Sequence, residues 1–257
     1  MSDEVEIRVH NPSVQPTLVY LPGLHGNWKL AGGFRRELGK RVRFIEITYP
    51  STTAWSFEDY ARGVESKLAE QGITEGWLLG ESFSSQVVWQ VLQRNNFKVR
   101  GVVFAGGFVR HPFQLAVRVA EKCFSGASFF LLSRIFRTYA KVTPFRFRRY
   151  PETYREIQGF VKSITRADFD SFKHRLKLIT ANDPRAIARQ TAVPIYAITG
   201  FFDPVVPWPW VRRWLKRNCG ALKEYKVIFR ADHNVLGTAP HIVAEEIILW
   251  MRKSDSR

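Results

Sequence analysis

Short runs of apolar and β-branched residues alternate along the chain with longer segments in which apolar residues recur every three or four positions. The apolar runs predict strands at residues 5–9, 17–21, 42–48, 77–80, 99–105, 195–199 and 225–229. The segments with helical spacing predict helices at residues 28–38, 56–69, 83–92, 209–217 and 240–251. Strands separated by helices of this length are typical of a mainly parallel sheet with helices on both faces.

The alternation of strands and helices stops between residues 108 and 190 and then resumes. A chain of 257 residues, 45% of them hydrophobic, is long enough to form one substantial core. One α/β core built from residues 1–107 and 191–257, with residues 108–190 inserted into it, fits this pattern better than two separate domains.

The segment most informative about function is Gly80-Glu81-Ser82-Phe83-Ser84, where a predicted strand turns directly into a predicted helix. Ser82 lies at the corner, beyond the strand and near the positive end of the helix dipole, and this position suits a nucleophile. The alternative is a serine that only caps the N-terminus of the helix. The motif is short, so its context along the chain must decide between the two interpretations.

A second predicted strand ends in the sequence PGLHG at residues 22–26. In open α/β sheets, ligands bind beyond the carboxyl ends of the strands. Glycines in this loop allow backbone N–H groups to turn inward, and the N–H groups of Leu24 and Phe83 are candidates for an oxyanion hole. His25, in the same loop, is expected to line the substrate pocket. A plain glycine-rich turn is the alternative, whereas the glycine spacing does not match a dinucleotide-binding fingerprint.

Two further strand ends supply a base and an acid. Of the six histidines, only His233 stands just past the carboxyl end of the last predicted strand. Asp203 follows the preceding strand and is expected to orient the imidazole of His233 and stabilise its charged form. Asp232 is the rival acid, but a sequence neighbour rarely turns its carboxylate onto the adjacent ring. The other alternative for Asp203 is a turn residue before proline.

Ser82, Asp203 and His233 follow one another in the order nucleophile, acid, base, each beyond a different strand. Together with the loop at residues 22–26, this order resembles the α/β-hydrolase superfamily over nearly the whole chain. Two departures stand out, because Ser84 replaces the last glycine of the usual Gly-x-Ser-x-Gly motif and Pro22 precedes Gly23 where many relatives have histidine. Neither departure removes a group that takes part in chemistry.

The resemblance implies an α/β-hydrolase fold and a role for each residue. It implies that Ser82 is the nucleophile, that His233 is the general base and then the general acid, and that Asp203 orients the imidazole. The oxyanion donors would be the N–H groups of Leu24 and Phe83. A serine at this position differs from the aspartate of haloalkane dehalogenases and epoxide hydrolases and from the cysteine of dienelactone hydrolases. It favours hydrolysis of a carboxylic ester or thioester, an amide or an activated C–C bond.

The insertion at residues 108–190 is expected to be a helical cap, or lid, over the site, with apolar helix faces above an acyl pocket. It contains 17 basic and 6 acidic residues, which accounts for +11 of the net charge of +16. Three explanations of this charge remain open: a solvated face without a partner, attraction of an anionic substrate such as an acyl-CoA, or weak association with an anionic membrane surface. Nucleic acid is not expected as a partner, because no recognised nucleic-acid module accompanies the charge.

Several further expectations concern cofactors and cellular context. No metal or cofactor is expected, because neither a His-x-x-x-His pair nor a cysteine cluster occurs in the sequence. Cys123 and Cys219 are expected to be buried, reduced thiols of a cytoplasmic protein. The acidic N-terminus has no apolar segment typical of a signal peptide, and no apolar run approaches the length of a membrane span. The oligomeric state does not follow from the sequence.

Two classes of function therefore remain. The first is a serine hydrolase that acts on a small-molecule ester or thioester. The second is a non-hydrolytic protein of the same fold that binds a ligand or interacts with another protein. A complete set of nucleophile, base and acid favours the enzyme.

Overall fold

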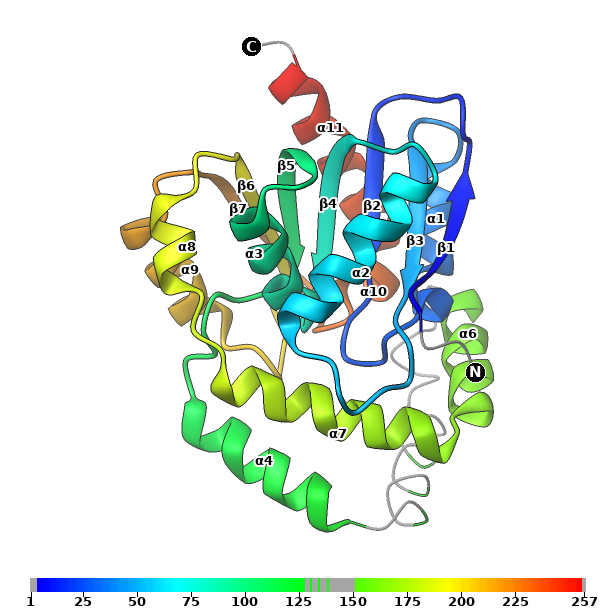
Figure 1. Cartoon of the computed structure of the whole chain (residues 1–257), viewed down its shortest axis with the longest axis vertical. Coiled ribbons are helices and arrows are strands. Elements are labelled where there is room, and N and C mark those ends of the chain that lie inside the picture. The colour runs from blue at the N-terminus through cyan, green and yellow to red at the C-terminus, as the bar shows by residue number, and fades with distance from the viewer. Residues whose placement is uncertain (1–3, 128–129, 131–133, 135–137, 139–150, 256–257) are drawn as a thin grey trace.

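A single sheet forms the centre of the molecule in the computed structural model, which describes residues 4–127, 130, 134, 138 and 151–255 (Figure 1). Its strand order is β1-β3-β2-β4-β5-β6-β7. The strands are β1 (Glu6–His10), β2 (Thr17–Leu21), β3 (Arg43–Thr48), β4 (Glu75–Glu81), β5 (Lys98–Ala105), β6 (Ile195–Gly200) and β7 (Leu222–Ile228). Only β1 is antiparallel to its neighbour, β3, and the other pairs are parallel. The predicted α/β-hydrolase fold with a mainly parallel sheet is confirmed.

Both faces of the sheet are covered because its strands are apolar on both sides. Leu18 and Tyr20 of β2 face a core that includes α1 (Gly32–Leu38), α10 (Val235–Thr238) and α11 (Pro240–Asp255). Val19 and Leu21 face the opposite core. The helices on that side are α2 (Phe57–Glu70), α3 (Ser84–Arg94), α8 (Arg185–Gln190) and α9 (Trp208–Asn218). The result is a three-layer arrangement of helix, sheet and helix.

Some element boundaries differ from those that the hydrophobic pattern predicts. The predicted helix at 28–38 is divided into a 3-10 turn, η1 (Trp28–Leu30), and α1, because the Asn27 side chain caps the turn and α1 begins separately at Gly32. The last strand, predicted at 225–229, is β7 at Leu222–Ile228, so its polar first residues belong to the strand. The exposed and partly buried positions of this edge strand give it a weak apolar signal.

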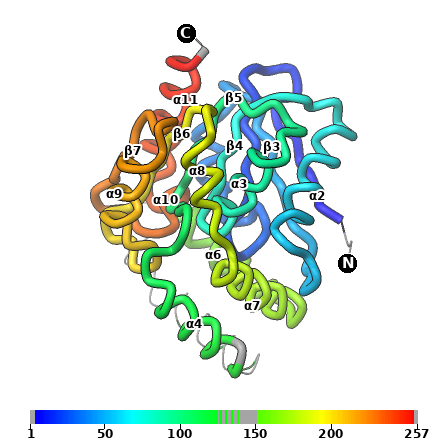
Figure 2. Tube along the Cα trace, turned by 60° about the vertical axis from the view of Figure 1, so that its left-hand side comes forward, coloured from blue at the N-terminus to red at the C-terminus, as the bar shows by residue number. Residues whose placement is uncertain are grey.

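Three helices lie near the carboxyl ends of the strands: α4 (Gln114–Gly126), α6 (Pro151–Ser163) and α7 (Arg166–Ala181) (Figure 1). A capping box between Thr165 and Asp168 starts α7. The rings of Phe124 and Phe172 pack 5.5 Å apart between α4 and α7, which run side by side below the sheet (Figure 2). Part of the expected cap lies outside the described residues. This part includes the basic residues Arg146, Arg148 and Arg149 and the apolar side chains at 129, 131, 132, 135, 136, 145 and 147.

The two cysteines differ in burial. Both are free thiols, and Cys219 is buried as expected. Cys123 is exposed on α4, so the prediction of two buried thiols is wrong for this residue. A helical segment need only bury one of its faces, and Cys123 lies away from the packed face of α4. Among the described residues, no helix combines the length and the apolar character that crossing a bilayer requires.

Candidate active site

The corner between β4 and α3 places Ser82 in an unusual backbone conformation. Its φ angle is +47°, in the left-handed region that costs non-glycine residues energy. Gly80 allows this tight corner, because a Cβ atom there would lie 2.9 Å from a methyl group of Val88 and 3.1 Å from the carbonyl oxygen of Ser84. The strand and helix therefore meet closely enough to hold Ser82 beyond the end of the strand.

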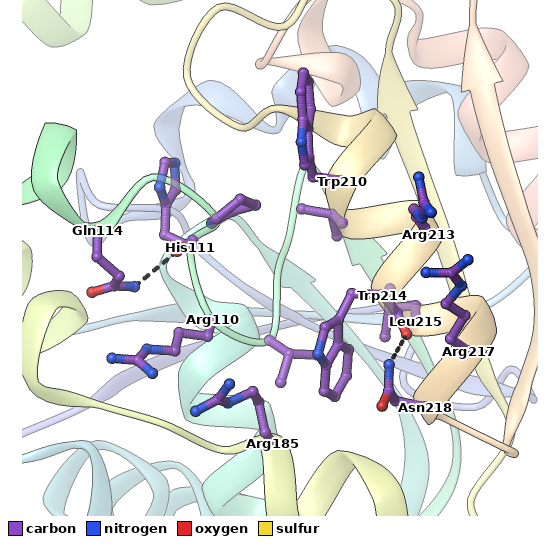
Figure 3. A pocket seen from close by; sticks show the side chains of 13 residues that line it. Arg110, His111, Gln114, Arg185, Trp210, Arg213, Trp214, Leu215, Arg217 and Asn218 are labelled. Carbon is purple, nitrogen blue, oxygen red and sulfur yellow. Dashed lines mark hydrogen bonds between the residues drawn. The ribbon is translucent and has the colours of Figure 1, made fainter.

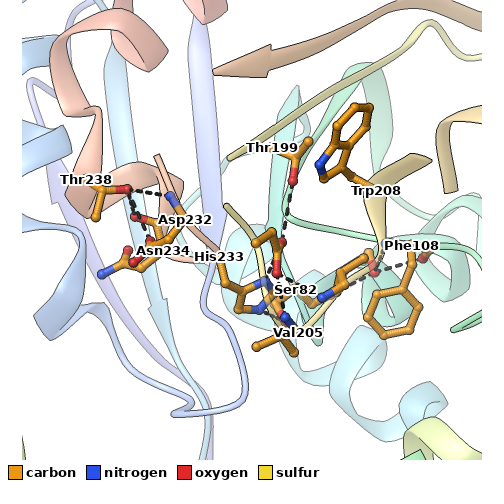
Figure 4. Close-up of polar contacts among 12 residues, drawn as sticks. Ser82, Phe108, Thr199, Val205, Trp208, Asp232, His233, Asn234 and Thr238 are labelled. Atoms are coloured by element: carbon orange, nitrogen blue, oxygen red, sulfur yellow. Dashed lines mark hydrogen bonds and ion pairs between the residues drawn. The ribbon is translucent and has the colours of Figure 1, made fainter. Parts of the chain in front are cut away.

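The structure brings Ser82, His233 and Asp203 together from three separate strand ends. Ser82 Oγ lies 2.8 Å from His233 Nε2. His233 Nδ1 lies 2.8 Å from Asp203 Oδ2. Figure 4 shows Ser82 and His233 facing each other, with Asp232 and Thr238 on the other side of the loop that carries His233. The three side chains thus form one hydrogen-bonded chain.

Asp203, rather than its rival Asp232, contacts the imidazole. The Asp203 side chain is fully buried, and its Oδ1 accepts hydrogen bonds from the backbone N–H groups of Val205 and Val206 at 2.8 and 2.9 Å. The Asp232 carboxylate accepts a hydrogen bond from Thr238 Oγ1 at 3.2 Å. The loop after β6 therefore fixes Asp203 with its second oxygen directed at His233.

Opposing influences act on the pKa of His233. Burial is the largest and by itself would lower this pKa. The hydrogen bond and negative charge of Asp203 act in the other direction, with smaller contributions from Glu81 and Asp232, and the pKa is raised above its ordinary value. The imidazole is therefore well suited to accept a proton and to hold it as a cation.

A cavity of about 360 Å³ adjoins Ser82. Its walls combine the site residues with largely apolar side chains from α6, α7 and the segment between them: Gly23, Leu24, His25, Leu30, Glu81, Ser82, Phe160, Ile164, Asp168, Phe169, Phe172, Val205, His233 and Asn234. Leu24 and Ser82 line the same cavity, so the loop after β2 and the corner after β4 face a common space. The Phe83 side chain is buried, whereas its N–H group precedes the first helical hydrogen bonds of α3.

His25 forms part of the cavity wall and is held differently from His233. Its Nε2 atom is buried without a hydrogen-bond partner among the described residues and lies 4.0 Å from Glu81 Oε2. Burial is the main cause of a lowered pKa for His25, which favours the neutral imidazole. Its ring also contacts the edge of Phe160 on α6, with the ring centres 5.9 Å apart. His25 does not belong to the chain of hydrogen bonds that begins at Ser82.

The residues on each side of Ser82 connect it to the loop after β2. Glu81 Oε2 accepts hydrogen bonds from Tyr20 Oη at 2.5 Å and from the Gly23 N–H group at 3.2 Å. Ser84 Oγ donates to the Pro22 carbonyl at 2.5 Å and lies 2.7 Å from Tyr49 Oη. From the sequence alone, Ser84 is only a departure from the Gly-x-Ser-x-Gly motif that removes no reactive group. The signal that could have identified it is the replacement itself, since a buried hydroxyl requires partners.

Arg175 of α7 is the second residue that sequence reasoning missed. Its guanidinium is buried and donates to the carbonyl oxygens of Leu24 at 3.1 Å and Pro50 at 2.9 Å, and to Tyr60 Oη at 3.1 Å. Gly26 leaves room for it, because a Cβ atom at Gly26 would lie 2.1 Å from Arg175 Nη1. Nothing in the local sequence distinguishes Arg175 from the many other basic residues of residues 108–190.

The remaining histidines have structural partners outside this chain of hydrogen bonds. His10 bonds to Glu46, His111 to the Val205 carbonyl, His174 to the Trp55 carbonyl and His241 to Glu37. His241 is largely exposed. Over the part of the chain that is described, no group of three or more His, Cys, Asp or Glu side chains is arranged to hold a metal ion.

Comparisons with known proteins agree with this architecture. Residues 18–246 match the family model described as the alpha/beta hydrolase family. No curated protein matches the chain by sequence. Among solved structures, a thermophilic esterase from Thermogutta terrifontis is similar with a TM-score of 0.77 and 18% identity, covering 97% of this chain and 93% of the esterase.

Two further esterases have similar structures. The esterase EaEST from Exiguobacterium antarcticum has a TM-score of 0.78 at 12% identity, with 96% of this chain and 95% of that chain covered. The esterase RhEst1 from Rhodococcus sp. ECU1013 has a TM-score of 0.75 at 17% identity, with 96% and 94% covered. At these identities the structural likeness shows the fold.

Proposed function

The chain belongs to the alpha/beta hydrolase family, and from this premise we propose that it is a serine hydrolase that cleaves a carboxylic ester or thioester. The observation that carries the proposal is the hydrogen-bonded chain of Ser82, His233 and Asp203 beside an apolar cavity. The esterases among the similar structures support the same class of reaction.

The proposed reaction proceeds through an acyl-enzyme. Ser82 Oγ attacks the carbonyl carbon while His233 Nε2 takes the hydroxyl proton, and Asp203 stabilises the imidazolium that forms. The negative charge on the carbonyl oxygen is stabilised by the N–H groups of Leu24 and Phe83. When the tetrahedral intermediate collapses, His233 gives its proton to the leaving alcohol or thiol. A water molecule, deprotonated by His233, then attacks the acyl-enzyme and releases the carboxylic acid and Ser82.

The cavity supports the proposal of a largely apolar acyl group. Leu30, Phe160, Ile164, Phe169 and Phe172 present apolar side chains to it, so burial of an alkyl or aromatic acyl group contributes to binding. A volume of about 360 Å³ suits a small to medium acyl group. We propose that residues 108–190 are the cap over this site and that His25 belongs to the wall of the substrate pocket.

Turnover of model substrates tests the proposal. A series of p-nitrophenyl esters of increasing acyl length, with the matching acyl-CoA thioesters, should be hydrolysed by the wild-type protein. Ser82→Ala and His233→Ala should lower kcat by several orders of magnitude, since each removes a group that acts in every turnover. Ser66→Ala and His241→Ala, at exposed positions away from the cavity, are matched controls and should keep full activity.

The same series separates the two functional classes. His25→Ala should reduce activity far less than His233→Ala, because His25 lies in the wall and outside the chain of hydrogen bonds. A protein that binds these esters without hydrolysing any of them would contradict the proposal and favour the non-hydrolytic alternative.

A further inference from the structure

A second pocket of about 490 Å³ lies between α9 and the segment that follows β5, apart from the cavity beside Ser82 (Figure 3). It is lined by Val109, Arg110, His111, Pro112, Gln114, Arg185, Trp210, Val211, Arg213, Trp214, Leu215, Arg217 and Asn218. None of these residues lines the cavity that contains Ser82. The proposed hydrolase chemistry therefore does not account for this pocket.

One face of α9 alternates aromatic and cationic side chains. Trp210, Arg213, Trp214 and Arg217 follow at intervals of three, one and three residues, which places them on one side of a helix. Val211 and Leu215 of the same helix are buried in the core. Figure 3 shows the two tryptophans and two arginines of α9 beside the pocket, together with Arg110 and Arg185 from other segments.

The charge of the pocket is only partly neutralised. Arg110 and Arg185 share the carboxylate of Asp183, at 3.2 and 2.6 Å. Within the described parts of the chain, Arg213 and Arg217 form no ion pair. Guanidinium groups bind phosphate groups through parallel hydrogen bonds, and they retain their charge at all physiological pH values. An anionic ligand would therefore find at least two unpaired cations here.

The aromatic side chains of the pocket favour a ligand that contains a planar aromatic group. Trp210 is 55% exposed, although indole rings usually bury most of their surface, and its ring packs 5.3 Å from that of Phe113. The Arg189 guanidinium lies 5.6 Å from the centre of the Trp214 ring. Trp214 itself is half-buried against the core. An exposed indole ring such as that of Trp210, beside cations, provides a stacking surface for the base of a nucleotide.

We propose that this pocket is a binding site for a nucleotide-like group, an aromatic base that carries phosphate esters. Base stacking on the exposed indole ring of Trp210 and phosphate binding by Arg213 and Arg217 would act together. The volume suits one nucleotide rather than a strand. The proposal does not depend on the catalytic role of Ser82.

The pocket also adjoins the loop that carries Asp203. His111 Nε2 donates to the carbonyl oxygen of Val205 at 3.0 Å, and the Val205 N–H group donates to Asp203 Oδ1 at 2.8 Å. Val205 itself lines the cavity beside Ser82. A ligand in the second pocket would thus lie beside the loop that forms one wall of the first.

Binding of adenosine 3′,5′-bisphosphate to the full chain, followed by calorimetry and tryptophan fluorescence, tests the inference. We expect saturable binding that is clearly tighter than that of adenosine or inorganic phosphate alone. The variant Arg213→Glu/Arg217→Glu should bind at least about tenfold more weakly, the loss that follows removal of one charged hydrogen bond. Trp210→Ala should also weaken binding.

A control double variant changes the net charge by the same amount, but at positions outside the pocket. Lys216→Glu/Lys223→Glu alters one residue of α9 that does not line the pocket and one exposed lysine of β7, and it should bind as the wild type does. Equal losses in the two double variants would show a general charge effect and would overturn the proposal. Absence of saturable binding, or preferential binding of a single-stranded oligonucleotide or of anionic phospholipid vesicles, would also overturn it.

Discussion

Asp203 illustrates how one buried carboxylate sets the chemistry of a neighbouring ring. Two backbone N–H groups hold one of its oxygens, and the other faces His233 Nδ1. Burial disfavours the charged imidazole, but the carboxylate outweighs this effect and raises the pKa of His233. In the proposed reaction, the proton that His233 takes from Ser82 would therefore be stabilised on the imidazole.

Replacing Asp203 with asparagine tests this balance. The active form requires a neutral His233, so kcat/KM should fall as the pH drops through the pKa of His233, which lies above the ordinary value of about 6.5. In Asp203→Asn the raising influence is lost and burial remains, so the acidic limb of the pH profile should move to lower pH. The maximal rate should fall by roughly 10⁴-fold, the loss that the same substitution causes in enzymes with a Ser-His-Asp triad. An unchanged acidic limb would contradict the assignment of Asp203.

The sequence predicts the three proposed catalytic side chains but not the residues that support them. Ser82, Asp203 and His233 each follow a strand, and the topology of a parallel sheet is enough to bring such positions together. Ser84 and Arg175 act through partners that are distant along the chain. Hydrophobic periodicity carries no information about these contacts, so only the folded structure reveals them.

Ser84→Ala measures the contribution of one supporting hydroxyl. It leaves the Pro22 carbonyl and the Tyr49 hydroxyl without this partner, a loss of about 1–3 kcal/mol in the free energy of unfolding. The Tm should fall by about 2–4 °C for each kcal/mol. Because Pro22 adjoins the loop that carries Leu24, kcat should fall more than KM rises. Ser171→Ala removes a buried hydroxyl that bonds only within α7 and should keep its kcat.

Helix α7 contacts the loop after β2 through Arg175. This guanidinium donates to the Leu24 and Pro50 carbonyls and to Tyr60, so the position of α7 and the conformation of the loop after β2 depend on each other. The strands, in contrast, follow from local pattern, and β2 has the predicted bounds. The bounds of helix α1 differ from the prediction because the Asn27 side chain caps a separate 3-10 turn before it. The bounds of strand β7 differ because its exposed edge positions weaken the apolar pattern.

Arg175→Met keeps much of the side-chain volume but removes every donor. Three acceptors then lose a partner, two of them in fully buried hydrogen bonds, and we expect kcat/KM for esters to fall at least about tenfold. Arg175→Lys keeps the charge without the forked geometry and should recover only part of this loss. Lys177→Met, an exposed position on the same helix, is the matched control. If Arg175→Met is less stable but fully active below its Tm, Arg175 has no role in positioning the loop.

The whole molecule combines a family fold with a strongly basic surface. The three-layer core places the proposed catalytic residues at the carboxyl ends of β4, β6 and β7, and helices α6 and α7 contribute apolar side chains above them. The net positive charge of the sequence alone does not distinguish a solvated surface from a binding site. The structure gathers part of this charge in the pocket beside α9, next to the exposed indole ring of Trp210.

Reaction with a fluorophosphonate probe tests the central claim, that Ser82 is an activated nucleophile. The wild-type protein should be labelled covalently with one probe per chain, and peptide mapping by mass spectrometry should find the label on Ser82. Ser82→Ala should remain unlabelled, His233→Ala should react far more slowly, and Ser66→Ala should react as the wild type does. A folded wild-type protein that does not react, or that carries the label on another serine, would contradict the account.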